Sequence, residues 1–196
     1  MGFDLAGYLL FAFVTSITPG PNNYLLFSYG KLFGFKRSSY LMFGIFLGFF
    51  VLLYIAGYGI AGIITQSSTA EIILKVVSSA WLLYLAIVLS RLSSEVSEGN
   101  NSRAGFLQGF ILQFVNPKAW IMAITGAAAF LPKSASIHFN VFIFAISFGL
   151  VGIPCMISWI AFGDLISKVL KSEKANRILG IVLFLLMVAS IVMIWI

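Results

Sequence analysis

Long hydrophobic runs separated by short polar stretches make up most of the chain. There are six of them, at residues 5–29, 39–64, 72–90, 104–131, 139–162 and 178–196. A transmembrane helix needs about 20 consecutive, mostly apolar residues, and every run comes close to that length or exceeds it. The pattern therefore predicts an all-α membrane protein whose six transmembrane helices form a single polytopic domain over residues 1–196.

Polar motifs that contain proline interrupt the first and the fourth run. They read Thr18-Pro19-Gly20-Pro21-Asn22-Asn23 and Asn116-Pro117-Lys118. Proline removes a backbone donor and breaks the helical hydrogen-bond ladder. Within a bilayer the freed carbonyl groups need partners, so such a break persists where it is packed in protein or lines a cavity. We therefore expect both helices to be broken at these prolines, close to a transporter-type binding site.

The two motifs lie half a chain apart, which suggests an internal repeat. Each half, about 1–92 and 103–196, holds three predicted spans. Because three is an odd number, the second half would enter the membrane in the opposite direction to the first, as in the inverted repeats of transporters. The alternative is a chance coincidence of two prolines, since membrane helices tolerate proline. We favour a 3+3 inverted repeat.

Charged residues are sparse and unevenly placed. The sequence is 61% hydrophobic and 9% charged, with a mean hydropathy of +1.06 and a formal net charge of +6, whereas soluble domains carry about 25% charged residues. Basic loop residues mark the cytoplasmic side of a membrane protein, so we interpret them as topology anchors rather than as a nucleic-acid site. With these loops in the cytoplasm, both termini should face outward. Nine basic residues share the predicted cytoplasmic side: Lys31, Lys36, Arg37, Arg91, Arg103, Lys168, Lys171, Lys174 and Arg177.

The first motif combines a polar helix face with an irregular backbone. In a continuous helix Thr15, Thr18 and Asn22 would lie on one face. A helix that resumes at Pro21 would present its first N–H groups to the break, which suits an anion such as a carboxylate. The carbonyl groups freed near Thr18 would face the same space. The candidate binding residues of this motif are Thr15, Thr18, Pro19, Gly20, Pro21, Asn22 and Asn23.

The second motif places a cation deep in the membrane. Lys118 lies about 14 residues after the start of its run, or roughly 20 Å along a straight helix, which is too deep for easy snorkelling. An intramembrane cation is a candidate functional residue, here as a counter-charge for a carboxylate or as a group that titrates. The alternative is that Lys118 pairs with backbone carbonyl groups for purely structural reasons. Gln113, Asn116 and Pro117 complete this candidate site.

Several other functions lack support in the sequence. We find no hydrolase triad, no metal-ligand cluster and no Walker motif, so we expect neither an enzyme nor a bound metal or cofactor. A proton or ion gradient is then the default energy source, although the deep carboxylate that often marks proton coupling is missing. The pairs Gly44/Gly48 and Gly105/Gly109 permit close helix contact. We favour contact between helices of the same chain, with a homodimer interface as the alternative.

Both motifs match a known family. The first motif, followed by Gly34-Phe35-Lys36-Arg37-Ser38 and the Gly44/Gly48 pair, and the segment Phe114-Val115-Asn116-Pro117-Lys118-Ala119-Trp120 resemble the lysine/homoserine-threonine exporter family (LysE/RhtB). The resemblance covers the whole chain in length, span number and motif order. It implies a multi-pass protein of the bacterial inner membrane, with periplasmic termini, that exports amino acids or close derivatives.

These observations lead to one favoured hypothesis and two alternatives. The favoured one is a proton-driven secondary exporter of a neutral amino acid, of the cysteine/O-acetylserine or homoserine/threonine class, working by alternating access. The substrate carboxylate would lie near Asn22 and Lys118, and its ammonium group near the carbonyl groups of Thr18 and Asn116. The alternatives are an ion or metal-ion transporter or channel on the same scaffold, and a membrane assembly subunit without a cavity.

Overall fold

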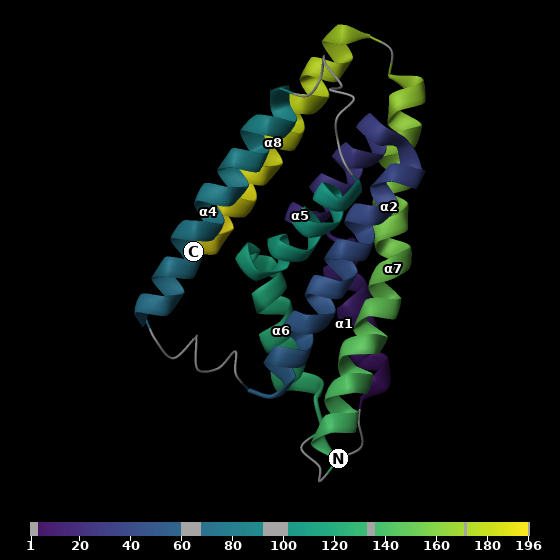
Figure 1. The fold of residues 1–196 in the computed structure, drawn as a ribbon. Coiled ribbons are helices and arrows are strands. Elements are labelled where there is room, and N and C mark those ends of the chain that lie inside the picture. Colours follow the sequence, from purple (N-terminus) through teal and green to yellow (C-terminus); the bar gives the residue numbers. More distant parts are fainter. Residues whose placement is uncertain (1–3, 60–67, 92–101, 133–135, 171, 196) are drawn as a thin grey trace.

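The computed structural model describes residues 4–59, 68–91, 102–132, 136–170 and 172–195, and all the regular structure in these residues is helical. Three helices in this part of the chain are long and apolar enough to cross a membrane, at Pro21–Gly57, Ile137–Val169 and Glu173–Val192. The protein is thus an all-α membrane protein. The helices are α1 (Leu5–Ile17), α2 (Pro21–Gly57), α4 (Ser68–Arg91), α5 (Ser102–Val115), α6 (Pro117–Phe130), α7 (Ile137–Val169) and α8 (Glu173–Trp195) (Figure 1).

The helix α2 folds back on itself at Gly34. The arm before this residue ends against Gly163, near the end of α7, whereas Gly57 at the end of the second arm lies against Val141, near the start of α7 (Figure 1). Gly34 has a φ of 71°, which side chains disfavour and glycine tolerates. We expected a loop over residues 30–38 between two spans. The structure replaces it with a turn at one glycine, flanked by helix on both sides.

α1 and the first arm of α2 follow one another through the molecule in one direction. α5 and α6 follow one another through it in the opposite direction. α1 begins beside the start of α7, where the Tyr8 hydroxyl donates a hydrogen bond to the carbonyl of Phe144. The first arm of α2 then reaches Gly163 near the far end of α7. In contrast, α6 approaches its end beside the start of α7, where Gly126 lies against Phe144. The chain segments between the paired helices therefore lie in the middle of the molecule.

The glycine pairs Gly44/Gly48 and Gly105/Gly109 bring α2 and α5 into backbone contact. A Cβ atom at Gly44 would lie 2.0 Å from the carbonyl oxygen of Phe106, and one at Gly48 would lie 2.5 Å from that of Phe110. Only glycine permits helices to approach this closely. The register also shows that α5 runs parallel to the second arm of α2. The expected packing of these motifs within the chain is confirmed.

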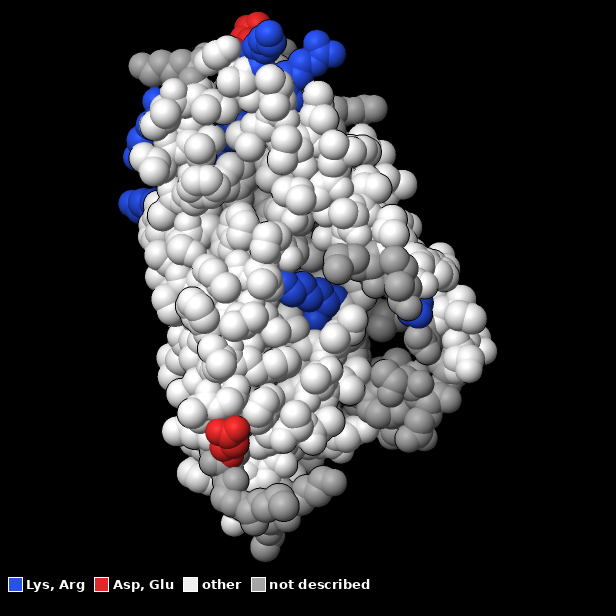
Figure 2. All heavy atoms as spheres, turned by 180° about the vertical axis from the view of Figure 1, so that it is seen from behind, with Lys and Arg blue, Asp and Glu red and all other residues white. Residues whose placement is uncertain are grey.

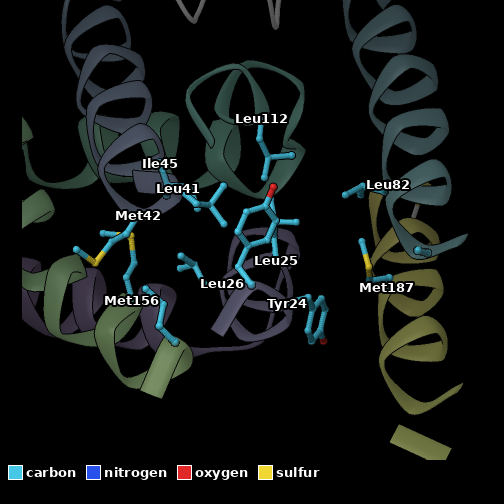
Figure 3. Close-up of a cluster of buried hydrophobic side chains, with 13 residues drawn as sticks. Tyr24, Leu25, Leu26, Leu41, Met42, Ile45, Leu82, Leu112, Met156 and Met187 are labelled. Atoms are coloured by element: carbon cyan, nitrogen blue, oxygen red, sulfur yellow. The ribbon is translucent and has the colours of Figure 1, made fainter. Parts of the chain in front are cut away.

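The hydrophobic core joins a separate pair of helices, α4 and α8, to the rest of the molecule. These two helices lie side by side along one edge of the bundle (Figure 1). Leu82 of α4 and Met187 of α8 point from this pair toward Tyr24 and Leu112 (Figure 3), and all four are buried in the same cluster. The outer faces of α4 and α8 carry exposed apolar side chains, as is expected of surfaces in contact with lipid.

Charged side chains gather at the ends of the molecule. Figure 2 shows basic groups clustered at the end where α7 leads into α8 in Figure 1, and far fewer charges along the middle of the face in view. Contacts place the first and fifth predicted loops at this same end, because the backbone of Lys31 lies against Gly163, and Gly34 lies beside Asp164. Asp164 pairs with Lys168 at 2.6 Å. These positions agree with the grouping of the first and fifth loops from the sequence, whereas residues 92–101 of the third loop lie outside the described residues.

Candidate functional site

The break between α1 and α2 is stabilised by side chains that replace the missing N–H groups of the two prolines. In a helix each N–H would bond the carbonyl four residues earlier. The carbonyl of Thr15 instead accepts a hydrogen bond from the Thr18 hydroxyl at 3.1 Å. The carbonyl of Ile17 accepts one from the indole N–H of Trp159, on α7, at 3.2 Å. The break is therefore packed against a neighbouring helix, as membrane burial requires.

Two further side chains bind the remaining carbonyl groups of this break. The buried amide of Asn23 donates to the carbonyl oxygens of Ser16 at 2.8 Å and Thr18 at 2.7 Å. The Lys118 ammonium group, from α6, donates to the carbonyl oxygen of Thr18 and to its hydroxyl oxygen, both at 2.9 Å, and to the carbonyl oxygen of Pro19 at 3.1 Å. An ammonium group has three N–H donors, so the first break engages all three.

The break between α5 and α6 is a compact helix cap. The side-chain oxygen of Asn116 accepts a hydrogen bond from the backbone N–H of Lys118 at 3.1 Å, and its carbonyl oxygen accepts from the N–H groups of Ala119 and Trp120. Asn116 is thus the N-cap of α6, with proline at the favoured first helical position. The indole N–H of Trp120 donates to the carbonyl oxygen of Phe114 at 2.9 Å.

Three amide side chains connect the two breaks. Asn22 and Gln113 bond reciprocally, with Asn22 Nδ2 donating to Gln113 Oε1 at 2.8 Å and Gln113 Nε2 donating to Asn22 Oδ1 at 3.0 Å. Asn116 Nδ2 also donates to Asn22 Oδ1, at 3.1 Å. Gln113 and Asn116 are buried, at 0% and 1% exposure. A buried polar network of this kind fixes the relative position of the helices that carry it.

A cavity opens between the two breaks. It holds about 550 Å³ of space between atoms when its open mouth is included. Its polar lining comes from the two breaks, and its apolar lining comes from the second arm of α2, from α7, and from Ala119 and Met122 of α6. The lining residues are Thr15, Ser16, Gly20, Pro21, Asn22, Asn23, Ile45, Phe46, Phe49, Asn116, Lys118, Ala119, Met122, Phe148, Gly149, Gly152 and Met156.

The structure brings the residues predicted for the site together, although they differ in position. Those that line the cavity are Thr15, Gly20, Pro21, Asn22, Asn23, Asn116 and Lys118. The other four do not line it: Thr18 and Pro19 bind the Lys118 ammonium group, Gln113 holds Asn22, and Pro117 is buried at the start of α6. The expectation that Thr18 and Asn116 offer open carbonyl groups is wrong, since each carbonyl oxygen already accepts two hydrogen bonds.

The apolar wall of the cavity was not predicted. It includes Phe46 and Phe49 from the second arm of α2, and Phe148 and Met156 from α7. Gly149 and Gly152 could have indicated the inward face of α7, because they leave room where Phe46 and Ser16 approach. Hydrophobicity along α7 does not mark one face, so the sequence could not show which residues of that helix point inward.

Charge in the cavity comes from one side chain. Among the lining residues Lys118 alone is charged. The acidic residues Asp4 and Asp164 lie elsewhere, since Asp4 caps α1 and Asp164 pairs with Lys168. In the part of the chain that the structure describes, no group of three or more His, Cys, Asp or Glu side chains could hold a metal ion. The cavity therefore offers a single cation, hydroxyl and amide groups, and an apolar wall.

Two comparisons with known proteins found matches to this chain. The family model for the LysE type translocator matches residues 13–194. The chain is also 30% identical over 186 residues to the cysteine/O-acetylserine efflux proteins of Salmonella choleraesuis (strain SC-B67) and Salmonella typhimurium, covering 94% of this chain and 93% of each relative. A relative of the same name from Escherichia coli O1:K1 / APEC is 27% identical over the same length. No solved structure matches significantly.

The chain therefore belongs to the LysE family of translocators.

Proposed function

We propose that this protein is a secondary exporter that moves a small neutral amino acid, or a close derivative, out across the bacterial inner membrane. Membership of the LysE family and the relatives named as cysteine/O-acetylserine efflux proteins support export of this class of compound. The observation that carries the proposal is the cavity between the two helix breaks, with Lys118 as its charged lining residue.

The chemistry of the cavity suits a zwitterion with a short side chain. Its carboxylate group would bind the Lys118 ammonium group and the N-terminus of α2, which favours anions. Its ammonium group would lie near the hydroxyl oxygens of Thr15 and Ser16, since the carbonyl groups first expected to receive it already have donors. The side chain would pack against Phe46 and Phe148. A basic amino acid would bring a second positive charge to a cavity whose lining residues include no carboxylate.

The proposed topology has six spans in two inverted halves, with the first and fourth span broken at their prolines. The opposite directions of α1–α2 and α5–α6, and the meeting of their breaks in the middle of the molecule, support this arrangement. The end that carries Lys31, Lys36 and Lys168 would face the cytoplasm, and both termini would be periplasmic. The proton gradient would drive export through alternating access.

The decisive experiment is export of labelled amino acids from cells that overproduce the protein. Cells loaded with labelled cysteine, O-acetylserine, homoserine, threonine or lysine should export a neutral substrate, and an uncoupler should abolish this export. Lys118→Ala should lose it while the protein still inserts into the membrane. The control is Lys168→Ala, because that side chain is 68% exposed, lies outside the cavity and pairs only with the neighbouring turn.

The outcomes separate the proposal from its alternatives. Export of a neutral amino acid by wild type and by Lys168→Ala, but not by Lys118→Ala, is the expected result. Normal export by Lys118→Ala would refute the role of this lysine. If wild type exports none of these amino acids but protects cells against metal salts, the function is ion transport instead.

A further inference from the structure

The Lys118 ammonium group uses all three of its hydrogen-bond donors within the protein. Its three hydrogen bonds all reach the break between α1 and α2, at the two oxygens of Thr18 and the carbonyl oxygen of Pro19. Because the group has three donors, a carboxylate entering the cavity has to displace at least one of these acceptors. Binding at Lys118 is therefore an exchange of partners.

The acceptor that is released most easily is the hydroxyl oxygen of Thr18. After Lys118 leaves, the hydroxyl keeps its own hydrogen bond to the carbonyl of Thr15 at 3.1 Å. The carbonyl oxygen of Thr18 likewise keeps the amide of Asn23 at 2.7 Å. The first break can thus give up Lys118 without leaving either oxygen of Thr18 unpaired, which would otherwise be costly.

We propose that the Thr18 hydroxyl is a positioning group that competes with the substrate carboxylate for Lys118. This inference rests on the proposed export function. In the structure Thr18 holds the Lys118 ammonium group of α6 against the first break. When a substrate binds, its carboxylate takes the place of the hydroxyl, and the bond between the two breaks is weakened. When the substrate leaves, the Thr18 hydroxyl recaptures Lys118 and so favours release.

The competition predicts an unusual effect of removing a polar group beside a binding site. Thr18→Val keeps the shape of the side chain but removes the competing acceptor, so the substrate should bind more tightly. One hydrogen bond to a charged group is worth about 1.5 kcal/mol at the low end of its range, which corresponds to about a tenfold change in affinity. We therefore expect the KM for export to fall about three- to tenfold, and the maximal rate to fall as well because release is slower.

The test compares the export kinetics of wild type, Thr18→Val and Thr18→Ser, with Thr18→Ala as a second variant without the hydroxyl. Internal substrate concentration is varied in everted vesicles or preloaded cells, and membrane levels of each protein are measured. The expected result is a lowered KM in the valine and alanine variants and a wild-type KM in the serine variant. A purely structural role for Thr18 would reduce the amount of protein or the maximal rate without lowering KM.

Two failures can be told apart in this design. If wild type exports substrate but Thr18→Val and Thr18→Ala have an unchanged or raised KM, the competition is refuted and the proposed function stands. If wild type exports no amino acid, the proposed function fails and the inference fails with it. Thermal unfolding of Thr18→Val, Lys118→Met and the double variant adds an independent measure. A coupling near zero between the two positions would show that the contact itself contributes nothing.

Discussion

The amide side chain of Gln113 holds the two helix breaks together, and replacing it with leucine should destabilise the protein measurably. Gln113 is fully buried and makes three hydrogen bonds, two with Asn22 and one to the carbonyl of Gly109 at 3.0 Å. Hydrogen bonds between membrane helices are worth about 0.6 kcal/mol each on average. Two of the three bonds join separate helices, and the third lies within α5. Leucine has a similar volume but no polar group, so Gln113→Leu should lower the free energy of unfolding by about 1.2 kcal/mol.

Gln108 on the same helix provides a matched control. Its side-chain oxygen accepts a hydrogen bond from the Tyr29 hydroxyl at 2.6 Å, and it lies outside the cavity. Gln108→Leu should therefore cost about 0.6 kcal/mol. Reversible unfolding of the purified proteins in mixed micelles, titrated with a denaturing detergent and followed by tryptophan fluorescence, would measure both values.

The same variants separate stability from binding. Because Asn22 lines the cavity and loses one of its two amide partners in Gln113→Leu, the KM for export should rise in this variant and stay unchanged in Gln108→Leu. The reasoning would be refuted if Gln113→Leu unfolds at the same detergent fraction as Gln108→Leu. Such a result would mean that the amide network contributes no more than a single peripheral hydrogen bond.

Two further predictions concern the packing around the site. Gly109→Ala should lower the free energy of unfolding by about 1–3 kcal/mol, because its Cβ would lie 2.5 Å from the carbonyl oxygen of Leu41. Gly105→Ala is the control and should be neutral or slightly stabilising, since its Cβ would have no contact closer than 3.5 Å. Equal unfolding of the two variants would contradict this view of the α2–α5 contact. Trp159→Phe replaces the indole with a smaller aromatic ring and removes the donor to the carbonyl of Ile17. The lost hydrogen bond should cost about 1 kcal/mol, measured by the same unfolding assay, and wild-type stability would contradict a role for this bond.

The sequence predicts those parts of the site that depend on local chemistry. Proline lacks an N–H group wherever it occurs, and in the structure α1 and α2 are separated beside Pro19, while α6 begins at Pro117. Glycine pairs at helical spacing likewise indicated close packing, and Gly44 lies against α5. The depth of Lys118 singled it out as a candidate, and it lines the cavity.

The remaining features depend on how distant helices are rotated against one another. The indole N–H of Trp159 donates a hydrogen bond to the carbonyl of Ile17, which lies 142 residues earlier in the sequence. Nothing in the sequence around Trp159 marks it as this donor. The apolar wall formed by Phe148 and Met156 belongs to a helix that is hydrophobic on all sides, so hydrophobicity carries no information on its orientation. The partners of Lys118 also could not be predicted, because carbonyl groups and a substrate are equally suitable acceptors for an ammonium group.

The pairing of α4 with α8 has a consequence for how the molecule can move. Each helix comes from a different half of the sequence, and the closest backbone contacts of the bundle, such as Gly44 with Phe106 and Gly163 with Phe27, also join one half to the other. Moving the halves apart as rigid bodies would break all of these contacts. The α4–α8 pair meets the other helices through a few side chains around Tyr24. The least costly plane of motion therefore runs beside this pair, and the mobile unit would combine one helix from each half of the sequence.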